Sequence, residues 1–438
     1  MGELLQPSQA LATDSGGSCQ VEKFLGSGGQ GEVYQARWEG KPFALKWYFP
    51  DSANAGQLRS LQTLVHKGPP SARFLWPLEL LSNSGFPGFG YLMQLRGPRF
   101  KGVIDIMKRR VEPSFRALAT AGFGLAESFL DLHAKGLCYC DISWGNVFLD
   151  PDTGEVAICD NDNVIVNGQK PTIAGTPYFM APEVVRAEAL PSIETDKFSL
   201  AVLLFYLFFV DHPLKGKKEA AIRAFDLPAM NKLFGTEPLY IFDPSDSSNA
   251  PVAGLHDNAI AFQEVYPTFL KKLFEKAFTT GLRDPQHGRV TENEWRSAMV
   301  RLRDSIVYCR HCGAENFYDA EAMQAGGGKP VACWSCAKDV VLPFRIRINK
   351  AVSMLNHDSK LYPHHVDDGR LFDFSGPVAE VVRHPQNPGI WGLKNLSSEK
   401  WVVIAQDGTA KDVEPGKSAP LASGSRINFG KVEGDIRY

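Results

Sequence analysis

The sequence predicts an α+β chain in which a bilobal domain is followed by a short cysteine-rich segment and a small all-β, sandwich-like domain. Three observations indicate this order. Short runs with strand-like patterning begin at Gln20, whereas apolar residues recur at helical spacing from about Phe115. Two Cys-x-x-Cys pairs come next. After about Val341, short β-like runs return between Gly, Pro, Asn and Asp turns.

The chain is long enough for several domains. It has 438 residues, of which 44% are hydrophobic and 22% are charged, so two or three folded parts are expected. We expect a flexible N-terminus at 1–18, a β lobe at about 19–96, a helical lobe at about 97–305, the cysteine segment at 306–340 and the β domain at 341–438. A β lobe beside a helical lobe predicts a cleft between them.

Charge and hydropathy exclude some partners. A formal net charge of −2 gives no global field that attracts nucleic acid or anionic lipid, so neither is expected to bind. The longest apolar run, Phe198 to Val210, covers thirteen residues, and a membrane helix needs roughly 18 to 20. It therefore predicts a buried helix. The first residues lack the basic and apolar regions of a signal peptide, which favours a cytoplasmic protein.

Three of the four glycines in GSGGQGEV are Gly26, Gly28 and Gly31, and the segment stands between two predicted strands. Because they have no side chains, their backbone amides can approach a triphosphate, and Val33 would cover the base. Dinucleotide-binding folds use the same spacing, and many glycine-rich hairpins bind nothing. Here a strand, and not a helix, follows the loop, which favours a nucleotide-binding hairpin.

The next strand contains Lys46, which can reach the α- and β-phosphates as a fixed cation; an exposed surface lysine is the alternative. The helix that follows is expected to supply a carboxylate for this lysine, yet no Asp or Glu occurs between Ser52 and Leu78. We expect Gln62, or less readily Gln57, to replace it. An amide lacks the charge of the usual partner, so we expect Lys46 to be held more loosely.

A second polar group follows the helical run that ends at His133. In LCYCDISWGNVFLD, Asp141 and Asn146 keep the Asp-x-x-x-x-Asn spacing of a phosphotransfer catalytic loop, where the Asp orients the attacking hydroxyl and accepts its proton. Nineteen residues beyond Asp141, a strand ends at Asp160. That carboxylate can bind magnesium between the β- and γ-phosphates, with Asn146 on the other side of the metal.

Together with the later segment GTPYFMAPE and an Asp at position 196 that opens the apolar helix, these motifs resemble the eukaryotic-like (Hanks-type) bacterial Ser/Thr protein kinases. The resemblance covers about Gln20 to about Ser305. It implies a bilobal protein-kinase fold that binds ATP and Mg²⁺ between its lobes. It also implies transfer of the γ-phosphate to Ser or Thr of protein substrates, the kinase itself included. Thr176 matches the threonine that positions the acceptor hydroxyl, which favours Ser/Thr over Tyr.

The same resemblance implies further positions. Ala44, on the strand of the lysine, would border the adenine, and Met93 looks like the gatekeeper. The backbone of Gln94 to Arg96 would bond the adenine edge. Glu183 and Arg289 look like the family's buried ion pair.

The activation segment departs from the family pattern. Tyr139-Cys140 replaces the usual His-Arg, so the arginine that binds an activation-loop phosphate is absent. Only 22 residues separate Asp160 from Glu183. We therefore expect constitutive competence, or control by the other domains, and not activation by loop phosphorylation.

Two further departures concern the chemistry. Ser143 stands where these kinases carry a lysine that neutralises charge on the phosphoryl group, so slower transfer is expected. Asp160-Asn161-Asp162 replaces Asp-Phe-Gly and adds a second carboxylate near the metal. A pseudokinase scaffold that binds nucleotide without turnover is therefore the alternative to an active enzyme.

The two cysteine pairs predict a metal site. Cys309 and Cys312 are separated by twenty residues from Cys333 and Cys336, a spacing that gives four thiolates to one tetrahedral Zn²⁺. We expect this four-cysteine zinc ribbon to be structural, because so short a segment has little core of its own. His311 lies inside the first pair, but four cysteines already complete the coordination.

The last hundred residues are similar to the distal half of forkhead-associated domains, which bind phosphothreonine peptides. The Ser-Arg-x-His segment that normally anchors the phosphate is missing, although Gly369-Arg370 matches a Gly-Arg turn. Arg383, Ser397 and Ser398 could form a phosphate site, and a domain that only packs on the kinase explains the same residues. A phosphopeptide-binding adaptor is therefore a further alternative function. The order of domains resembles bacterial kinases found with type 2C protein phosphatases, which implies such a phosphatase as antagonist.

Overall fold

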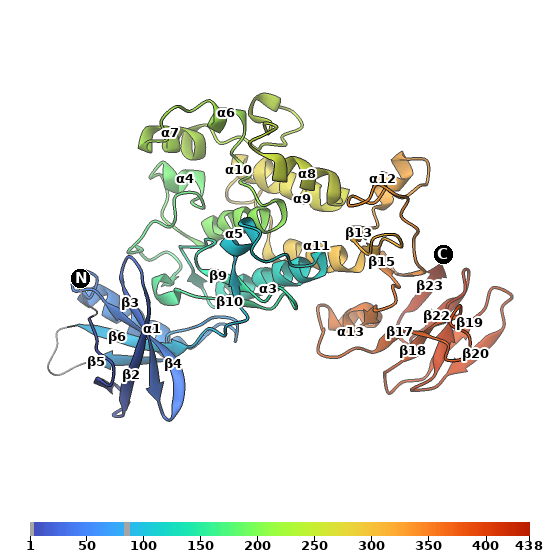
Figure 1. Ribbon diagram of the computed structural model, residues 1–438, viewed down its shortest axis with the longest axis horizontal. Helices are drawn as coiled ribbons and strands as arrows, with labels where there is room; N and C mark the ends of the chain where they lie inside the picture. Colours follow the sequence, from blue (N-terminus) through green and yellow to red (C-terminus); the bar gives the residue numbers. More distant parts are fainter. Residues whose placement is uncertain (1–3, 83–87) are drawn as a thin grey trace. The chain divides into compact units, whose positions relative to one another are not determined.

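The computed structural model in Figure 1 describes residues 4–82 and 88–438. The chain forms two compact units. The first comprises Met1–Gln263 and Lys272–Arg296, and the second comprises Glu264–Lys271 and Ser297–Tyr438.

A closed barrel begins the first unit. Its strands, shown in blue in Figure 1, are β1 (Ala10–Thr13), β2 (Ser18–Ser27), β3 (Gly31–Trp38), β4 (Lys41–Tyr48), β5 (Glu79–Ser82) and β6 (Phe89–Gln94). They follow the order β1-β2-β3-β4-β6-β5, and their pairs are antiparallel. Tyr34, Trp47 and Leu92 fill the barrel and are fully buried. The three strands that the sequence predicts after Gln20 are β2, β3 and β4.

The expected flexibility of residues 1–18 is wrong for the described part of that segment. β1 pairs with both β2 and β5, and its Leu11 lies opposite Cys19. Leu5 and Leu11 are buried in the barrel core. Inward and outward side chains alternate over only four residues here, a strand period too short to stand out in a Ser/Gly-rich sequence. Residues 1–3 lie outside the described residues.

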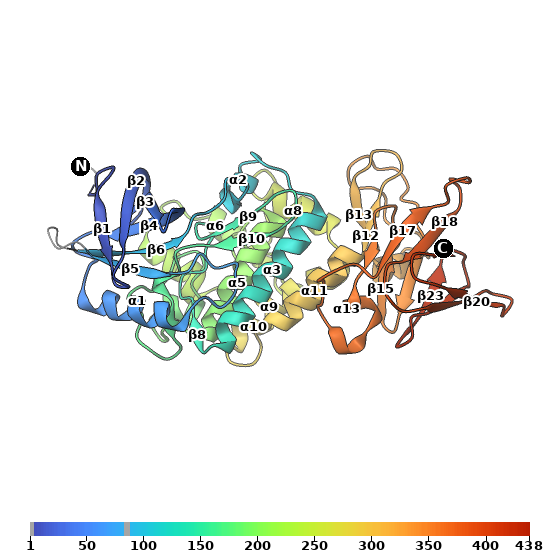
Figure 2. The same cartoon turned by 90° about the horizontal axis from the view of Figure 1, so that it is seen from below.

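Helix α1 (Ala55–Lys67) packs beside the barrel (Figures 1 and 2). The Asn54 side chain caps its first turn, and Gly68, with φ of 67°, ends it. Its buried residues are Gln57, Leu61 and Leu64, which follow helical spacing along one face.

Helices dominate the rest of the first unit. The two longest, α3 (Phe115–Ala134) and α5 (Ile193–Phe209), begin after capping serines, Ser114 and Ser192. Residues 198–209 of α5 are all buried, which confirms the prediction of a buried helix. The shorter helices are α2 (Val103–Met107), α4 (Pro182–Val185), α6 (Lys217–Ala220), α7 (Leu227–Asn231) and α10 (Thr280–Arg283), with a π turn at η2 (Lys232–Thr236) and a 3-10 turn at η3 (Ser247–Asn249). Residues of both units contribute to α8 (Asp257–Val265), α9 (Thr268–Phe278) and α11 (Glu292–Asp304). No helix in the described ranges is long and apolar enough to cross a membrane.

Two small sheets hold the polar segments of interest. One has the order β10-β9-β7, from Val156–Ile158, Val147–Leu149 and Lys101–Gly102, and the other pairs β11 (Ile165–Val166) with β8 (Leu137–Cys138). The loop between β8 and β9 contains Asp141 and Asn146. The 3-10 turn η1 (Asn161–Asn163) comes shortly after β10.

The second unit contains the cysteine pairs and the β domain. β12 (Ile306–Tyr308) and β13 (Glu315–Phe317) form a hairpin, followed by α12 (Ala320–Ala325). Two antiparallel sheets then share one core that includes Ile346, Leu393 and Trp401. The first sheet has the order β15-β14-β23-β22-β19-β20, and the second has the order β16-β17-β18-β21. The sequence predicted a sandwich-like domain here. Their strands are β14 (Arg345–Ile348), β15 (Ala351–Met354), β16 (Lys360–Leu361), β17 (Ala379–Arg383), β18 (Trp391–Asn395), β19 (Trp401–Ile404), β20 (Ala410–Val413), β21 (Ser418–Pro420), β22 (Arg426–Asn428) and β23 (Glu433–Arg437), with α13 (Pro363–Val366) and η4 (Asp368–Arg370) between β16 and β17.

Candidate active site and metal centre

The glycine-rich turn connects β2 to β3. Gly26 and Gly28 have no atom within 4 Å of the place where a side chain would begin. At Gly31 a Cβ would lie 2.2 Å from the carbonyl oxygen of Trp47, so the pairing of β3 with β4 requires glycine there. The first two glycines thus leave open space above the turn, whereas the third is required by the fold.

Lys46 on β4 lies at the centre of a polar cluster. Its Nζ is 2.8 Å from Asp160 Oδ1 and 2.8 Å from Asp162 Oδ2, and it also donates to Gln30 Oε1 at 3.3 Å. Its side chain is 5% exposed. Burial favours the neutral amine, but the carboxylates of Asp162 and Asp160 outweigh burial and raise the pKa of Lys46. The lysine is therefore a cation at neutral pH.

The expected replacement of the helix carboxylate by Gln62 is wrong. Gln62 is exposed on α1, whereas Gln57 is 3% exposed. Gln57 does not bond Lys46 either: its Nε2 donates to the backbone oxygen of Asp162 at 3.0 Å and to the Tyr48 hydroxyl at 3.2 Å. The lysine is held by two carboxylates of the segment after β10, so the looser hold that we expected is also wrong.

The predicted adenine residues lie together. Val33, Ala44 and Met93 belong to one apolar cluster, which Cys159 also joins. Gln94 ends β6 with an exposed side chain. Arg96 follows, and its guanidinium donates to the Phe100 carbonyl at 2.8 Å and lies 3.8 Å from the centre of the Phe148 ring.

Asp141 and Asn146 of the predicted catalytic loop form a hydrogen-bonded group with Thr176. Thr176 Oγ1 donates to Asp141 Oδ1 at 2.7 Å, and Asn146 Nδ2 donates to the Asp141 backbone oxygen at 2.9 Å and to Oδ2 at 3.2 Å. Burial raises the pKa of Asp141, and the hydrogen bonds from Thr176 and Asn146 partly offset that effect. The structure thus brings the predicted catalytic Asp, Asn and Thr together.

Asp196 at the start of α5 positions this loop. Its carboxylate accepts from the backbone N–H of Tyr139 at 2.5 Å and of Cys140 at 3.1 Å. Behind it, His133 of α3 bonds Asp196 through Nε2 at 3.2 Å and Glu292 through Nδ1. Burial disfavours the charged ring, but the two carboxylates outweigh it and raise the pKa of His133 to about 9. The sequence did not indicate this histidine as part of the site.

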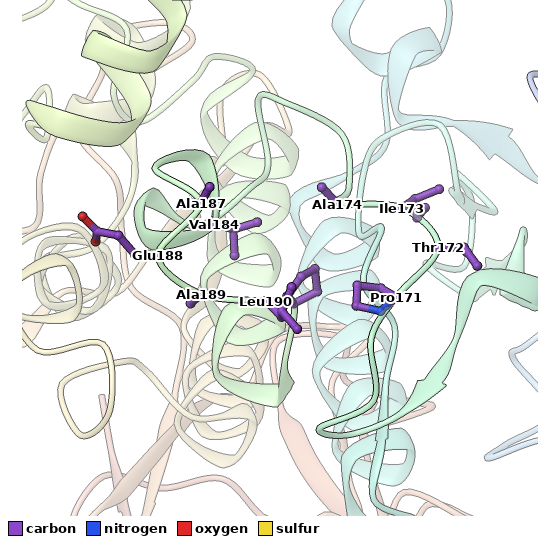
Figure 3. Close-up of a pocket in the computed structure, with 10 residues that line it drawn as sticks. Pro171, Thr172, Ile173, Ala174, Val184, Ala187, Glu188, Ala189 and Leu190 are labelled. Carbon is purple, nitrogen blue, oxygen red and sulfur yellow. The ribbon is translucent and has the colours of Figure 1, made fainter.

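Cys140, which replaces the usual arginine, lies 3.5 Å from Cys138 through the two sulfur atoms, and both side chains are buried. It has a positive φ of 69°. The neighbouring activation segment packs on the chain that follows α4. A pocket of about 330 Å³ is lined by Pro171 and Ala174, by Val184 of α4 and by Leu190 of the chain that follows it. Figure 3 shows how these side chains lie.

The predicted buried ion pair is confirmed. Arg289 Nη2 lies 2.6 Å from Glu183 Oε1, and the two side chains are 3% and 14% exposed. Arg289 also donates to the backbone oxygen of Glu194 at 2.6 Å. The pair therefore joins the start of α4 to the start of α5.

The four paired cysteines converge in the second unit. The sulfurs of Cys309, Cys312, Cys333 and Cys336 all lie within 4.8 Å of one another. Two of the distances, between Cys309 and Cys336 and between Cys312 and Cys333, are 3.7 Å. A tetrahedral Zn²⁺ with Zn–S bonds of about 2.3 Å has sulfurs about 3.8 Å apart, so the cluster fits this ion. Asn316 Nδ2 is 3.5 Å from the Cys333 sulfur, as expected of a donor to a metal-bound thiolate.

A pocket of about 510 Å³ lies in the β domain and is lined in part by Arg370, Ser397 and Ser398. Arg383 is not among its lining residues, so the expected grouping of Arg383 with the two serines is wrong. Its guanidinium lies 4.4 Å from the centre of the Trp391 ring. The sequence had left open whether Gly369-Arg370 was significant.

Part of the chain is similar to known proteins. Residues 124–279 match the family model "Protein kinase domain". Serine/threonine-protein kinase plk-2 of Caenorhabditis elegans is 27% identical over 216 residues, which are 44% of this chain and 31% of that protein. Cell cycle serine/threonine-protein kinase CDC5/MSD2 of Saccharomyces cerevisiae is 27% identical over 212 residues, 44% of this chain and 28% of that protein. Protein kinase C delta type of Mus musculus is 35% identical over 92 residues, 20% of this chain and 13% of that protein. The chain thus spans less than a third of the length of these relatives.

Proposed function

We propose, from the protein kinase domain match and the geometry around Asp141, that this chain transfers the γ-phosphate of ATP to Ser or Thr of protein substrates, itself included. The similarity to two serine/threonine-protein kinases supports the choice of acceptor. The observation that carries the proposal is the 2.7 Å hydrogen bond from Thr176 to Asp141, because it puts a hydroxyl where an acceptor serine or threonine would need one.

Asp141 acts as the base. Its raised pKa makes the carboxylate a better proton acceptor than an exposed Asp, while the bonds from Thr176 and Asn146 fix its orientation. The acceptor hydroxyl donates a hydrogen bond to Asp141 Oδ1, either in place of Thr176 or together with it. Proton transfer to Asp141 then accompanies attack of the hydroxyl oxygen on the γ-phosphorus, while the bond from that phosphorus to the bridging oxygen breaks and ADP leaves.

The nucleotide lies between the glycine-rich turn and the cluster around Lys46. Lys46 binds the α- and β-phosphates, and the apolar group of Val33, Ala44 and Met93 borders the adenine, with Gln94 to Arg96 at its edge. Asp160, whose side chain is 43% exposed, and the Asn146 side-chain oxygen, whose amide nitrogen is turned to Asp141, are the hard oxygen donors that suit Mg²⁺. When bound there, Mg²⁺ would neutralise charge on the phosphate oxygens.

The rival is a pseudokinase that binds nucleotide without turnover. The test is incubation of the full chain with labelled ATP, Mg²⁺ and a generic acceptor protein, followed by phosphoamino-acid analysis. Wild type is compared with Asp141→Asn, Asp160→Ala and the control Asp152→Asn, an exposed residue on the turn after β9. Phosphoserine or phosphothreonine from wild type and the control alone supports the proposal. Equal, negligible incorporation of labelled phosphate by all four proteins would favour the pseudokinase. Ser143 predicts slow transfer, so the incubation extends to hours.

We further propose that the cluster of four cysteines binds one structural Zn²⁺. All four positions are protein ligands, which leaves none for a substrate. The test is the metal content of the purified chain by mass spectrometry. One zinc per chain in wild type and less in Cys312→Ser supports the proposal, whereas metal-free, folded wild-type protein contradicts it.

A second candidate function is phosphopeptide binding by the β domain, favoured by the pocket that contains Arg370, Ser397 and Ser398. Arg370 is paired with Asp373, so a phosphate would have to compete with that carboxylate. Fluorescence titration with a phosphothreonine peptide library tests this, with Arg383→Ala as the control that lies outside the pocket. A type 2C protein phosphatase as antagonist is a proposal by analogy of domain order alone.

A further inference from the structure

Lys46 has two carboxylate partners whose surroundings differ. Asp160 and Asp162 both lie 2.8 Å from its Nζ, but their side chains are 43% and 0% exposed. Asp160 therefore faces the open side of the cluster, where a nucleotide and a hydrated cation could reach it. Asp162 is enclosed on all sides.

The enclosure of Asp162 argues against its being a second metal ligand. Its Oδ2 accepts from Lys46 Nζ and from the Tyr48 hydroxyl. A protein-bound Mg²⁺ keeps several water molecules and needs an open face for them. A carboxylate with no exposed surface provides no such face, so Asp162 Oδ2 binds protein donors and not a metal ion.

The turn that contains Asp162 is fixed from both sides. Gln57 of α1 donates to the Asp162 backbone oxygen at 3.0 Å. Asn161 Nδ2 donates to the backbone oxygens of Leu75 at 2.8 Å and Ile158 at 3.0 Å. These amide contacts place the carboxylate under Lys46 without any acidic residue on α1.

We propose that Asp162 is the positioning residue for Lys46 and holds its ammonium toward the phosphates. A carboxylate on α1 was expected in this role, but α1 has none. This rests on the proposed function, since it assigns Lys46 to ATP. Asp160 can then turn to the metal while Lys46 keeps one permanent counter-charge. The carboxylates that hold Lys46 come from the segment after β10, and α1 contributes only through the Gln57 side chain, which fixes the turn around Asp162.

A double-mutant cycle on the full chain tests the proposal by binding, not by activity. The four proteins are wild type, Lys46→Met, Asp162→Asn and Lys46→Met/Asp162→Asn, with Asp152→Asn as control. Calorimetry measures the affinity for ATP with Mg²⁺ and for adenosine, and thermal unfolding reports folding. Because Asp162 acts through Lys46, Asp162→Asn should weaken ATP binding about tenfold in the wild-type background and less than twofold in the Lys46→Met background. Adenosine affinity and the control should stay unchanged.

Every outcome decides the question. An equal loss of ATP affinity in both backgrounds, as a metal ligand would give, overturns the proposal. If Asp162→Asn alone fails to fold and the double variant folds, Asp162 is the counter-charge of Lys46, as proposed. If neither folds, Asp162 serves the fold independently of Lys46 and the proposal is wrong. Wild type that binds ATP but transfers no phosphate refutes the proposed activity and leaves the cycle valid, whereas wild type that binds no ATP refutes both.

Discussion

His133 should make the stability of the first unit depend on pH. Both ring nitrogens lie against carboxylates, Nδ1 against Glu292 and Nε2 against Asp196. Only the doubly protonated ring can donate to both. The substitution His133→Gln removes the charge and leaves only one nitrogen that can donate hydrogen bonds.

The magnitude follows from the pKa. The folded-state pKa of His133 is about 9 and its ordinary value is 6.5, and one unit corresponds to about 1.4 kcal/mol, so the shift contributes roughly 3 kcal/mol. A group with a raised pKa in the folded state contributes its full stabilisation at pH values below its unfolded-state pKa. That stabilisation is lost as the pH rises through the folded-state pKa. The contribution is therefore about 3 kcal/mol at pH 6, about 1 kcal/mol at pH 8 and close to zero at pH 10.

Urea unfolding of wild type and His133→Gln at pH 6, 7, 8, 9 and 10 measures this contribution. The difference in free energy of unfolding between the two proteins should shrink steadily across that range. Groups that titrate in both proteins cancel in the difference. A difference that stays constant from pH 6 to pH 10 would refute the reasoning, because it would mean that His133 is neutral in the folded protein.

Three further predictions concern other parts of the chain. Gly31→Ala should lower the unfolding temperature, because its Cβ would meet a backbone oxygen at 2.2 Å, whereas Gly28→Ala should leave it unchanged; differential scanning fluorimetry compares them. Arg289→Ala leaves Glu183 without its cation and should cost about 3 to 5 kcal/mol in urea unfolding; a cost under about 1 kcal/mol would contradict the pairing. Zinc removal by a chelator should abolish amide-exchange protection around Cys312 while α5 stays protected; unchanged exchange in both would contradict a structural metal.

The sequence was sufficient to predict those structural features that one recognisable pattern determines. Helical spacing predicted α3 and α5, and the interval between Asp141 and Asn146 predicted two side chains that do hydrogen-bond. The Cys-x-x-Cys spacing predicted the convergence of four sulfurs. The helices and the Asp141–Asn146 contact depend on residues close in the chain, and the cysteine cluster follows from a recurring spacing of metal ligands, so all three could be predicted.

The partner of Lys46 could be predicted only in part. Gln57 shares a helical face with Leu61 and Leu64, so the period of α1 already indicated that it is the buried glutamine. The path of the chain after β10 could not be predicted, because Asp160 adopts a positive φ of 55° and the following turn moves Asp162 under the lysine. Contacts across 116 positions in the sequence determine that placement.

Likewise, the sequence did not predict the pocket of the β domain. Arg370 and the pair Ser397-Ser398 come from separate loops, and only the register of the two sheets determines which arginine lies near the serines. Arg383 ends β17 and turns to Trp391 on the neighbouring strand. Sequence similarity could not distinguish the two arginines.

Cys159 gives the proposed adenine site an attachment point for chemical probes. Its thiol joins the apolar cluster of Val33, Ala44 and Met93, directly before Asp160 in the chain. Burial raises the pKa of Cys159 to about 12, so at neutral pH the thiol stays in its protonated, weakly reactive form. General thiol reagents are therefore expected to leave Cys159 unmodified. An electrophile attached to an adenine-like group would stay bound beside the thiol, and this long residence time would compensate for the low reactivity of the thiol. Labelling of Cys159 would then report how much of the site is occupied in a cell extract.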